Sequence, residues 1–530
     1  MKALFVFNAL LAVGLGPEAA LAAAAKDAAP ATKGKPADFF QPNDVHTFHL
    51  ILTPEEWARM QPAGGGFARG GRGGPMGGNG AERYPQATAT LEVDGAKWGD
   101  LHVRFKGNSS FNFAGNSLKH SLKLDFNDLD AKASLSGLDK LNLNNDAMDS
   151  SGLRETLAYD VFHVAGVAAP RTALAKVYLT VPGQYERTYL GAYTAIEQVD
   201  KDFLKDRFGE KGGLLIKPEQ NATLGYLGES WSTYESRMGE KVDATAAEGR
   251  RFVDFVRLLN QANDEEFARR IGDYVDVDQF LKFVAVQAAL VNYDSPLMSG
   301  HNYYLYLNPK DHRFVWIPWD QNEAFGSFGV NGANAANMSI LEPSAPNSFR
   351  MADRVLAMPG ARAKYEAVVR DLLAGPFKPE RLDARVAELA PVVRGTVAAD
   401  PLINARTFER QLARDPSTIQ PPVRNGPNGP PQAPPNGGPG GPGGRGGVMP
   451  GPGGDKPPLV FFYHERAQAI ADQLAGRTEG IRPQGGPMGG RGGPGGGPQP
   501  GRGPGGGQPG FGPGVGPGGQ GPNGPPRGGQ

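Results

Sequence analysis

Short segments in which apolar and polar residues alternate dominate the first half of the chain. Segment 119–128 places Leu122, Leu124 and Phe126 on one face, and Lys123 and Asp125 on the other. This period of two is typical of half-buried strands, and an Asp-Gly pair at 94–95 favours a hairpin turn. A mostly antiparallel sheet is therefore predicted, with further strands in ranges 45–50, 87–110, 172–200 and 212–219.

The pattern changes to helical spacing from about residue 240. One helix is already expected at 149–167, with apolar residues at 153, 157, 161 and 164 and a cap from Ser150 or Ser151. Later helices are predicted at 246–262, 276–294, 348–360, 361–375, 379–397 and 464–477. We expect an α+β fold of two lobes, sheet-rich at 38–240 and helical at 241–480, with a ligand cleft between them.

Glycine (76 residues) and proline (47 residues) are concentrated in three places. Ranges 63–80, 421–454 and 484–530 have almost no apolar side chains to bury, so we expect two disordered inserts and a disordered tail. The formal net charge is zero, and no nucleic-acid partner is expected. The absence of cysteine excludes disulfides, thiolate zinc sites and thiol catalysis.

The N-terminus resembles a secretory leader. Lys2 precedes an apolar run at 3–15, and Ala-Leu-Ala at 20–22 offers a cleavage site. The run is short for a membrane span. We expect a signal peptide at 1–22, export to the periplasm, cell surface or medium, and no membrane span after cleavage.

A polar, glycine-containing loop follows the strand that ends at Lys106. Backbone N–H groups and hydroxyls of this loop, at 107–117, could hold phosphate, with Lys123 on the next strand reaching it. A plain hairpin with a solvent-facing lysine explains the same residues. Glu155 suits the first turn of its helix electrostatically, and could equally pair with Lys123.

Segment 292–326 carries polar residues at both ends of an aromatic hairpin. Asn302 starts the first predicted strand and Asp320 ends the second, so the two should lie close together, with Asp294 returning to the same place. Carboxylate and amide oxygens suit Mg²⁺ or Mn²⁺. Ordinary turn and cap roles remain the alternative.

The sequence resembles the spore coat protein H (CotH) kinase family. The matching pieces are RFKGNSS, SLKLDF, LRETLAYDVFHVAG, GAYTAIEQVDKDFLKDRFG, GLLIKPE and HNYYLYLNPKDHRFVWIPWDQNEAFG, in the family's order. The resemblance implies an atypical protein-kinase-like fold. It also implies transfer of the γ-phosphate of ATP, with Mg²⁺ or Mn²⁺, to secreted or surface proteins.

The resemblance also implies residue roles. Lys123 would be the kinase lysine with Glu155 as its helix partner, although Lys106 and Lys217 compete for the phosphate. Asp294 would deprotonate the acceptor hydroxyl. The further implied roles are a phosphate-covering loop at Gly107, Ser109 and Ser110, an adenine hinge from Glu197 to Val199, and metal binding by Asn302 and Asp320.

The chain departs from ordinary kinases at several points. Asn292-Tyr293-Asp294 stands where His-Arg-Asp is usual, and Asn322 stands where relatives often have a second acid. Two other functions therefore stay open. One is a catalytically weak or inactive scaffold that binds surface or matrix components, and the other is a metal-dependent hydrolase.

Overall fold

The computed structural model describes residues 34–41, 43–62, 84–107, 109–218, 224–326, 332–419 and 456–484. These residues all belong to one compact unit, Met1–Gly489. The predicted leader at 1–22, the inserts at 63–80 and 421–454, and the tail after residue 484 lie outside the described residues. Within the described part of the chain, no helix combines the length and the apolar character needed to cross a bilayer.

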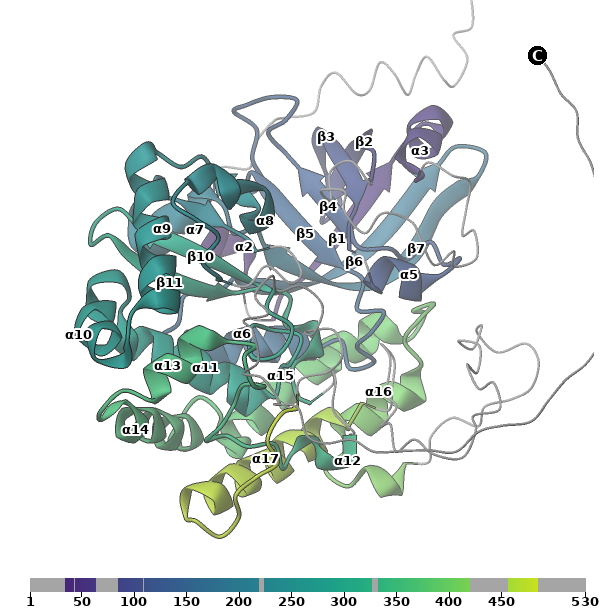
Figure 1. Cartoon of the computed structure of the whole chain (residues 1–530). Coiled ribbons are helices and arrows are strands. Elements are labelled where there is room, and N and C mark those ends of the chain that lie inside the picture. The colour runs from purple at the N-terminus through teal and green to yellow at the C-terminus, as the bar shows by residue number, and fades with distance from the viewer. Residues whose placement is uncertain are drawn as a thin grey trace, which may run out of the picture. The chain divides into compact units, whose positions relative to one another are not determined.

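The first half forms a closed barrel, in which strand β1 pairs antiparallel with β2 and parallel with β6 (Figure 1). Its interior is a separate hydrophobic core. The expected strands are confirmed, but the sheet is not open. Closure leaves no unpaired edge. The barrel order is β1 (Val45–Ile51), β2 (Ala87–Val93), β3 (Ala96–Phe105), β4 (Leu122–Asp125), β5 (Lys140–Asn144), β7 (Tyr185–Glu197) and β6 (Thr172–Val181).

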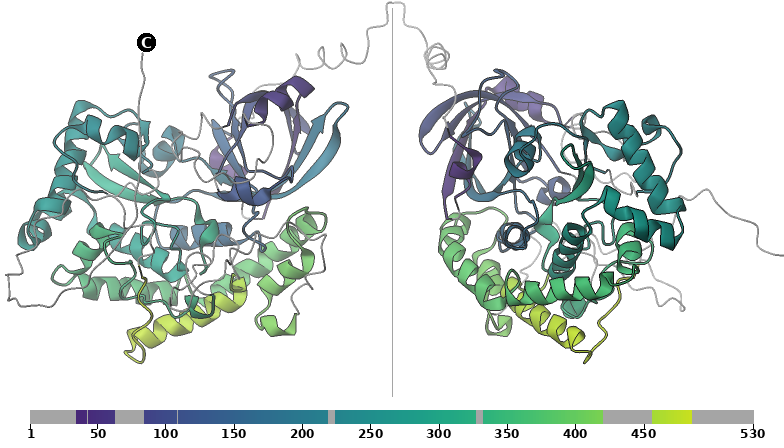
Figure 2. Two further views of the ribbon diagram at one scale, coloured as in Figure 1. Left: turned by 45° about the vertical axis from the view of Figure 1, so that its right-hand side comes forward. Right: turned by 90° about the vertical axis from the view of Figure 1, so that its left-hand side faces the viewer.

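A second sheet packs with the helices around another hydrophobic core (Figure 2). Its order is β11 (Arg313–Pro318), β10 (Tyr303–Asn308), β8 (Leu215–Ile216) and β9 (Glu240–Val242). β8, expected in the sheet-rich lobe, pairs instead with β10. The α+β class is confirmed, whereas the two-lobed arrangement stays a prediction.

Most helices belong to the later part of the chain. The longer ones are α6 (Arg154–Val164), α7 (Lys201–Phe208), α9 (Ala246–Gln261), α10 (Asp264–Tyr274), α11 (Val277–Leu290), α14 (Ala361–Ala374), α15 (Pro379–Val397), α16 (Ala405–Leu412) and α17 (Leu459–Leu474). The shorter ones are α2 (Pro36–Phe39), α3 (Pro54–Met60), α5 (Ser109–Ala114), α8 (Glu235–Met238), α12 (Gly332–Ala335), α13 (Arg350–Leu356) and the 3₁₀ turns η2 (Trp231–Thr233), η3 (Gln321–Glu323) and η4 (Pro416–Thr418).

Helix α6 starts later than the sequence predicts, and Ser151 contributes to its cap, since Ser151 Oγ accepts the backbone N–H of Leu153 at 3.2 Å. The carboxylate of Asp149 accepts hydrogen bonds from the backbone N–H groups of Leu153 (3.1 Å) and Arg154 (2.9 Å). Two of the N–H groups that a helix start leaves unpaired are thereby satisfied. This cap fixes the direction in which Glu155, the second helical residue, projects.

A buried ion pair joins the barrel to the loop after α15. Lys119 Nζ lies 2.7 Å from Asp400 Oδ2, and both side chains are fully buried. The same carboxylate accepts the backbone N–H of Ala192 at 2.7 Å. At Gly191, with φ +136°, a Cβ would lie 2.6 Å from Asp400 Oδ2. Only glycine leaves room for this link.

Replacing Asp400 by Ala should lower the free energy of unfolding by about 3–5 kcal/mol, because Lys119 would remain buried without its counter-charge. Urea unfolding measures the loss. Asp371→Ala, on the exposed side of α14, is the matched control and should change the free energy by less than about 0.5 kcal/mol. Equal effects in both variants would contradict this role for the ion pair.

Candidate active site

The outer face of β3, β4 and β5 carries basic and amide side chains. Arg104, Lys123 and Asn142 lie side by side in register across the three strands. Leu122 and Leu124 point into the barrel core. The alternation read from the sequence therefore places the lysine outside the barrel, on a face with an excess of positive charge.

Lys106 and Glu155 meet on this face through one amide. Lys106 Nζ donates to Asn144 Oδ1 at 2.8 Å, and Asn144 Nδ2 donates to Glu155 Oε2 at 2.8 Å. The other Glu155 oxygen accepts the backbone N–H of Gln321 at 3.2 Å. Burial, together with the nearby charge of Asp320, raises the pKa of Glu155 to about 8. The α6 acid thus connects the barrel to the residues after β11.

The structure corrects the expected pairing of Lys123 with Glu155, since Lys106 lies beside Glu155 instead. Lys123 has no hydrogen-bond or ion-pair partner among the described residues. Burial, together with the positive charges of Arg104, Lys106 and Lys140, lowers the pKa of Lys123 to about 7. Asp125 opposes this shift only in part, so an anionic ligand would stabilise the protonated form of Lys123.

Asp294 and Asn302 contact each other directly at the start of the β10–β11 hairpin. Asn302 Nδ2 donates to the backbone oxygen of Asp294 at 2.8 Å and to its carboxylate at 3.1 Å. His301 Nε2 lies 3.3 Å from the other carboxylate oxygen. Burial raises the pKa of Asp294 to about 6; His301 opposes this shift, and Asp320 adds to it. The carboxylate is held in place and is ionised near neutral pH.

Asp320 follows β11 in the left-handed conformation, with φ +55°. The backbone N–H of Trp319 donates to Asn302 O at 3.1 Å, which brings the two hairpin ends together as the sequence predicts. Asp320 also influences the ionisation of Glu155, Lys106 and Asp294, so it lies among them.

These two residues can supply oxygen ligands to a hard cation. Neither the carboxylate of Asp320 nor the amide oxygen of Asn302 accepts a hydrogen bond from any described group. The N–H₂ group of Asn302 donates to Asp294, so the amide oxygen of Asn302 is available to a cation. No group of three His, Asp or Glu side chains in the described ranges has metal-binding geometry. The protein would therefore provide only part of a metal's coordination shell.

The predicted phosphate loop begins at Gly107 and includes the short helix α5. Gly107 has φ +91°, and a Cβ there would lie 2.3 Å from Ser110 Oγ. Its carbonyl oxygen accepts the Tyr84 hydroxyl at 2.6 Å. Ser109 and Ser110 open helix α5 rather than an extended loop. Because Gly107 directly follows Lys106, the loop begins at the cationic face.

The side chains of Glu197 and Val199 do not face the site, which corrects their expected use. Glu197 is buried against Arg171 and Arg207, and Val199 lies in the hydrophobic core. Gln198, between them, accepts from Asn142 Nδ2 at 3.1 Å and donates to the Tyr304 hydroxyl at 3.2 Å. A hinge role could rest only on the backbone of this segment and on Gln198.

Lys217 also reaches the candidate site. Its Nζ lies 5.0 Å from the ring centroid of Trp319 and 5.6 Å from that of Tyr304. Lys106 Nζ lies over the same Trp319 ring at 5.5 Å. The indole just before Asp320 thus lies within the range of cation–π attraction of two lysines.

Sequence reasoning missed Asn144 and Trp319. The signal for Asn144 was present, because Asn142 and Asn144 alternate with buried leucines at 141 and 143. Trp319 gave no such signal, since aromatic residues fill the whole hairpin.

A sequence profile of the family described as "CotH kinase protein" matches residues 103–420. The "Inner spore coat protein H" of Bacillus subtilis (strain 168) is 24% identical over 292 residues, which cover 54% of this chain and 76% of that protein. The "Invasin CotH2" of Rhizopus delemar is 23% identical over 319 residues, which cover 57% of this chain and 51% of that protein.

Two solved structures show weaker likenesses. The Shewanella oneidensis HipA–HipB–operator complex gives a TM-score of 0.27 at 14% identity, covering 76% of this chain and 78% of that chain. The Helicobacter pylori proinflammatory kinase CtkA gives 0.21 at 11% identity, covering 62% and 95%. TM-scores this low support no inference about fold or activity.

Proposed function

Because this chain belongs to the CotH kinase family, we propose that it is an exported protein kinase that transfers the γ-phosphate of ATP to hydroxyl groups of secreted or cell-surface proteins. One observation carries the proposal. The basic face of β3–β4 and the oxygen-rich end of the β10–β11 hairpin are joined through Asn144, Glu155 and the backbone of Gln321. Cations for phosphate and oxygens for a metal thus lie in one site.

The basic residues would hold the nucleotide's phosphates. Lys106 is oriented by Asn144, while Lys123 has no protein partner. Charge neutralisation of this kind is the main contribution of protein groups to phosphoryl transfer. The nucleobase would lie toward Gln198 and Tyr304, where the barrel and the hairpin are hydrogen-bonded to each other.

Asn302 and Asp320 would bind Mg²⁺ or Mn²⁺ through oxygen, with phosphate and water as the other ligands. Such an ion neutralises charge on the phosphates. The expected second acid is missing, because Asn322 stands there. The next acid, Glu323, is buried and lies 3.0 Å from Lys456 Nζ, so it is already paired.

Asp294 would act on the acceptor. Its carboxylate takes the proton of a hydroxyl whose oxygen attacks the γ-phosphorus, while the bond to the β–γ bridging oxygen breaks and ADP leaves. A general base requires an ionised group within hydrogen-bond reach. Asn302 and His301 hold this carboxylate in one orientation.

The scaffold function remains the second candidate, because Asn322 leaves two protein ligands for the metal. Calorimetric titration with ATP and Mn²⁺ distinguishes the kinase function from the scaffold function. We expect metal-dependent nucleotide binding that is lost in Lys106→Met. A folded protein that binds no nucleotide with either metal would refute the kinase and leave the scaffold.

Nucleotide affinity should fall as pH rises, because Lys123 loses its proton above about pH 7 in the free protein. Phosphate restores the charge and raises this pKa, so binding takes up a proton, and affinity weakens by up to about tenfold per pH unit between about pH 7.5 and 9.

Two variants serve as controls for this pH dependence. Lys123→Arg should bind nucleotide with an affinity that does not depend on pH in this range, since arginine stays charged. Lys123→Met should bind weakly at every pH in this range. If nucleotide affinity depended on pH in both variants as it does in the wild-type protein, a group other than Lys123 would cause the dependence.

A further inference from the structure

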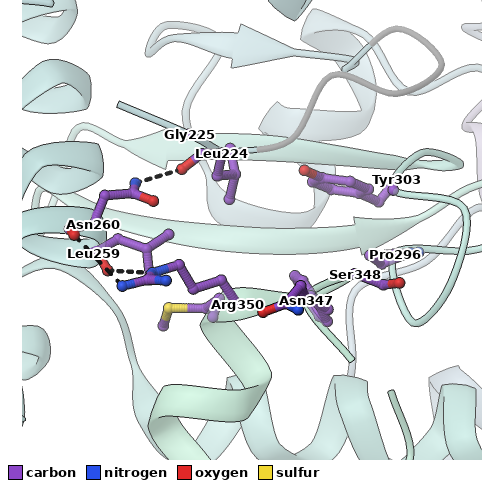
Figure 3. Close-up of a pocket in the computed structure, with 12 residues that line it drawn as sticks. Leu224, Gly225, Leu259, Asn260, Pro296, Tyr303, Asn347, Ser348 and Arg350 are labelled. Carbon is purple, nitrogen blue, oxygen red and sulfur yellow. Dashed lines mark hydrogen bonds between the residues drawn. The ribbon is translucent and has the colours of Figure 1, made fainter. Parts of the chain in front are cut away.

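A pocket of about 190 Å³ opens beside the loop that carries Asp294 (Figure 3). Its wall includes Pro296 and Gly300 from that loop and Tyr303 from β10. Pro296 follows Asp294 by two residues, and Gly300 precedes His301, whose Nε2 contacts the Asp294 carboxylate. The pocket therefore adjoins the loop that holds the proposed base.

Strand β10 separates this pocket from the proposed nucleotide site. The Tyr304 hydroxyl accepts a hydrogen bond from Gln198 on the nucleotide side. Tyr303 precedes it, and successive residues of a strand point to opposite faces. Tyr303 thus lines the pocket on the face of the hairpin opposite to Gln198.

The hydroxyl of Tyr303 has no hydrogen-bond partner among the described residues, although the side chain is only 2% exposed. Figure 3 shows the hydroxyl end of its ring directed toward Leu224, across from Arg350 and Asn347. The hydroxyl faces the pocket, so a ligand that offers an acceptor there would give it a hydrogen-bond partner.

The rest of the wall is mainly apolar, with one fixed cation. Leu224, Leu259, Phe349 and Met351 contribute apolar surface. Arg350 Nε donates to Leu259 O at 3.1 Å and its Nη2 to Asn260 O at 3.5 Å, so its guanidinium is held at the end of α9. A dry cavity of about 150 Å³ accepts benzene, so this pocket has room for an aromatic ring.

We propose that this pocket selects acceptor proteins that carry an aromatic side chain, tyrosine above all, next to the phosphorylated hydroxyl; this inference rests on the proposed kinase function. The ring would fill the pocket and pack against its apolar wall. Its phenolic oxygen would accept a hydrogen bond from the Tyr303 hydroxyl. The planar guanidinium of Arg350 would lie against the ring, an arrangement that arginine and aromatic rings favour.

Binding can be tested without any kinase activity by using p-cresol, which is the tyrosine side chain, and toluene, which lacks the hydroxyl. Saturation-transfer NMR should detect p-cresol on the wild-type protein and not on Leu224→Trp, which fills the pocket. Leu227→Trp, at a side chain that is 40% exposed and outside the pocket, should bind it normally. Tyr303→Phe should weaken p-cresol about fivefold and leave toluene unchanged.

Selection is tested with serine peptides in which each flanking position is varied. The wild-type protein should phosphorylate peptides with a flanking tyrosine at a KM at least about tenfold lower than peptides with alanine there, and Leu224→Trp should abolish the difference. No p-cresol binding, no preference among phosphorylated peptides, or a preference for acidic neighbours would each overturn the inference. If no peptide or protein is phosphorylated, the kinase proposal fails instead, and the p-cresol result alone decides whether the pocket binds aromatic rings.

Discussion

Replacing Asp294 by Asn is expected to lower kcat for phosphotransfer by a factor of about 10²–10⁴ while ATP affinity changes little. The amide keeps the size of the side chain and can still accept from Asn302 Nδ2, but it has no basic oxygen for the acceptor proton. Steady-state kinetics with separate titrations of ATP and acceptor show whether the substitution changes kcat or the KM of either substrate.

Asp311→Asn is the matched control for Asp294→Asn. Asp311 lies in the turn of the same hairpin, where its carboxylate accepts the backbone N–H of Arg313 at 3.1 Å, and it is exposed. We expect kcat to stay within about twofold of the wild type. If Asp294→Asn also retained full kcat, the general base would have to be another residue.

Replacing Asp320 by Ala is expected to have the largest effect, with loss of metal-dependent ATP binding and a fall in transfer of at least about a thousandfold. The change removes one of the two oxygen ligands that the protein offers, and Asn322 gives no acid in its place. Calorimetry with ATP and Mn²⁺ checks binding, and labelled ATP checks transfer.

Unfolding is not the expected cause of that loss. The charge of Asp320 raises the pKa values of Glu155 and Asp294, so it repels both acids, but it also attracts the buried Lys106. Because these effects oppose each other, the midpoint of urea unfolding of Asp320→Ala should stay close to that of the wild-type protein. A lower unfolding midpoint together with lost activity would point to a structural role for this residue instead.

Local patterns predicted much of the site. Alternation placed Lys123 on the outer face of its strand, and the two aromatic strands of the hairpin brought Asn302 and Asp320 to the same end. These features depend on residues close together in the chain. They follow from strand periodicity and hairpin geometry alone.

Features that depend on distant segments were not predictable. Barrel closure requires β1 to pair with β6, and the two strands share no sequence signal for parallel pairing. The choice between Lys106 and Lys123 as the neighbour of Glu155 depends on how α6 crosses the barrel face. Asn144 links Lys106 to Glu155, because its amide oxygen accepts from Lys106 while its N–H₂ group donates to Glu155.

The central claim is that this site transfers phosphate to protein. The most direct measurement incubates the purified full-length chain with γ-labelled ATP and Mn²⁺ or Mg²⁺, beside Asp320→Ala, and follows the label to protein or to inorganic phosphate. We predict metal-dependent label on hydroxyl side chains, mapped by mass spectrometry, and none in the variant. Label released only as inorganic phosphate, or equal labelling of the variant, would contradict the account.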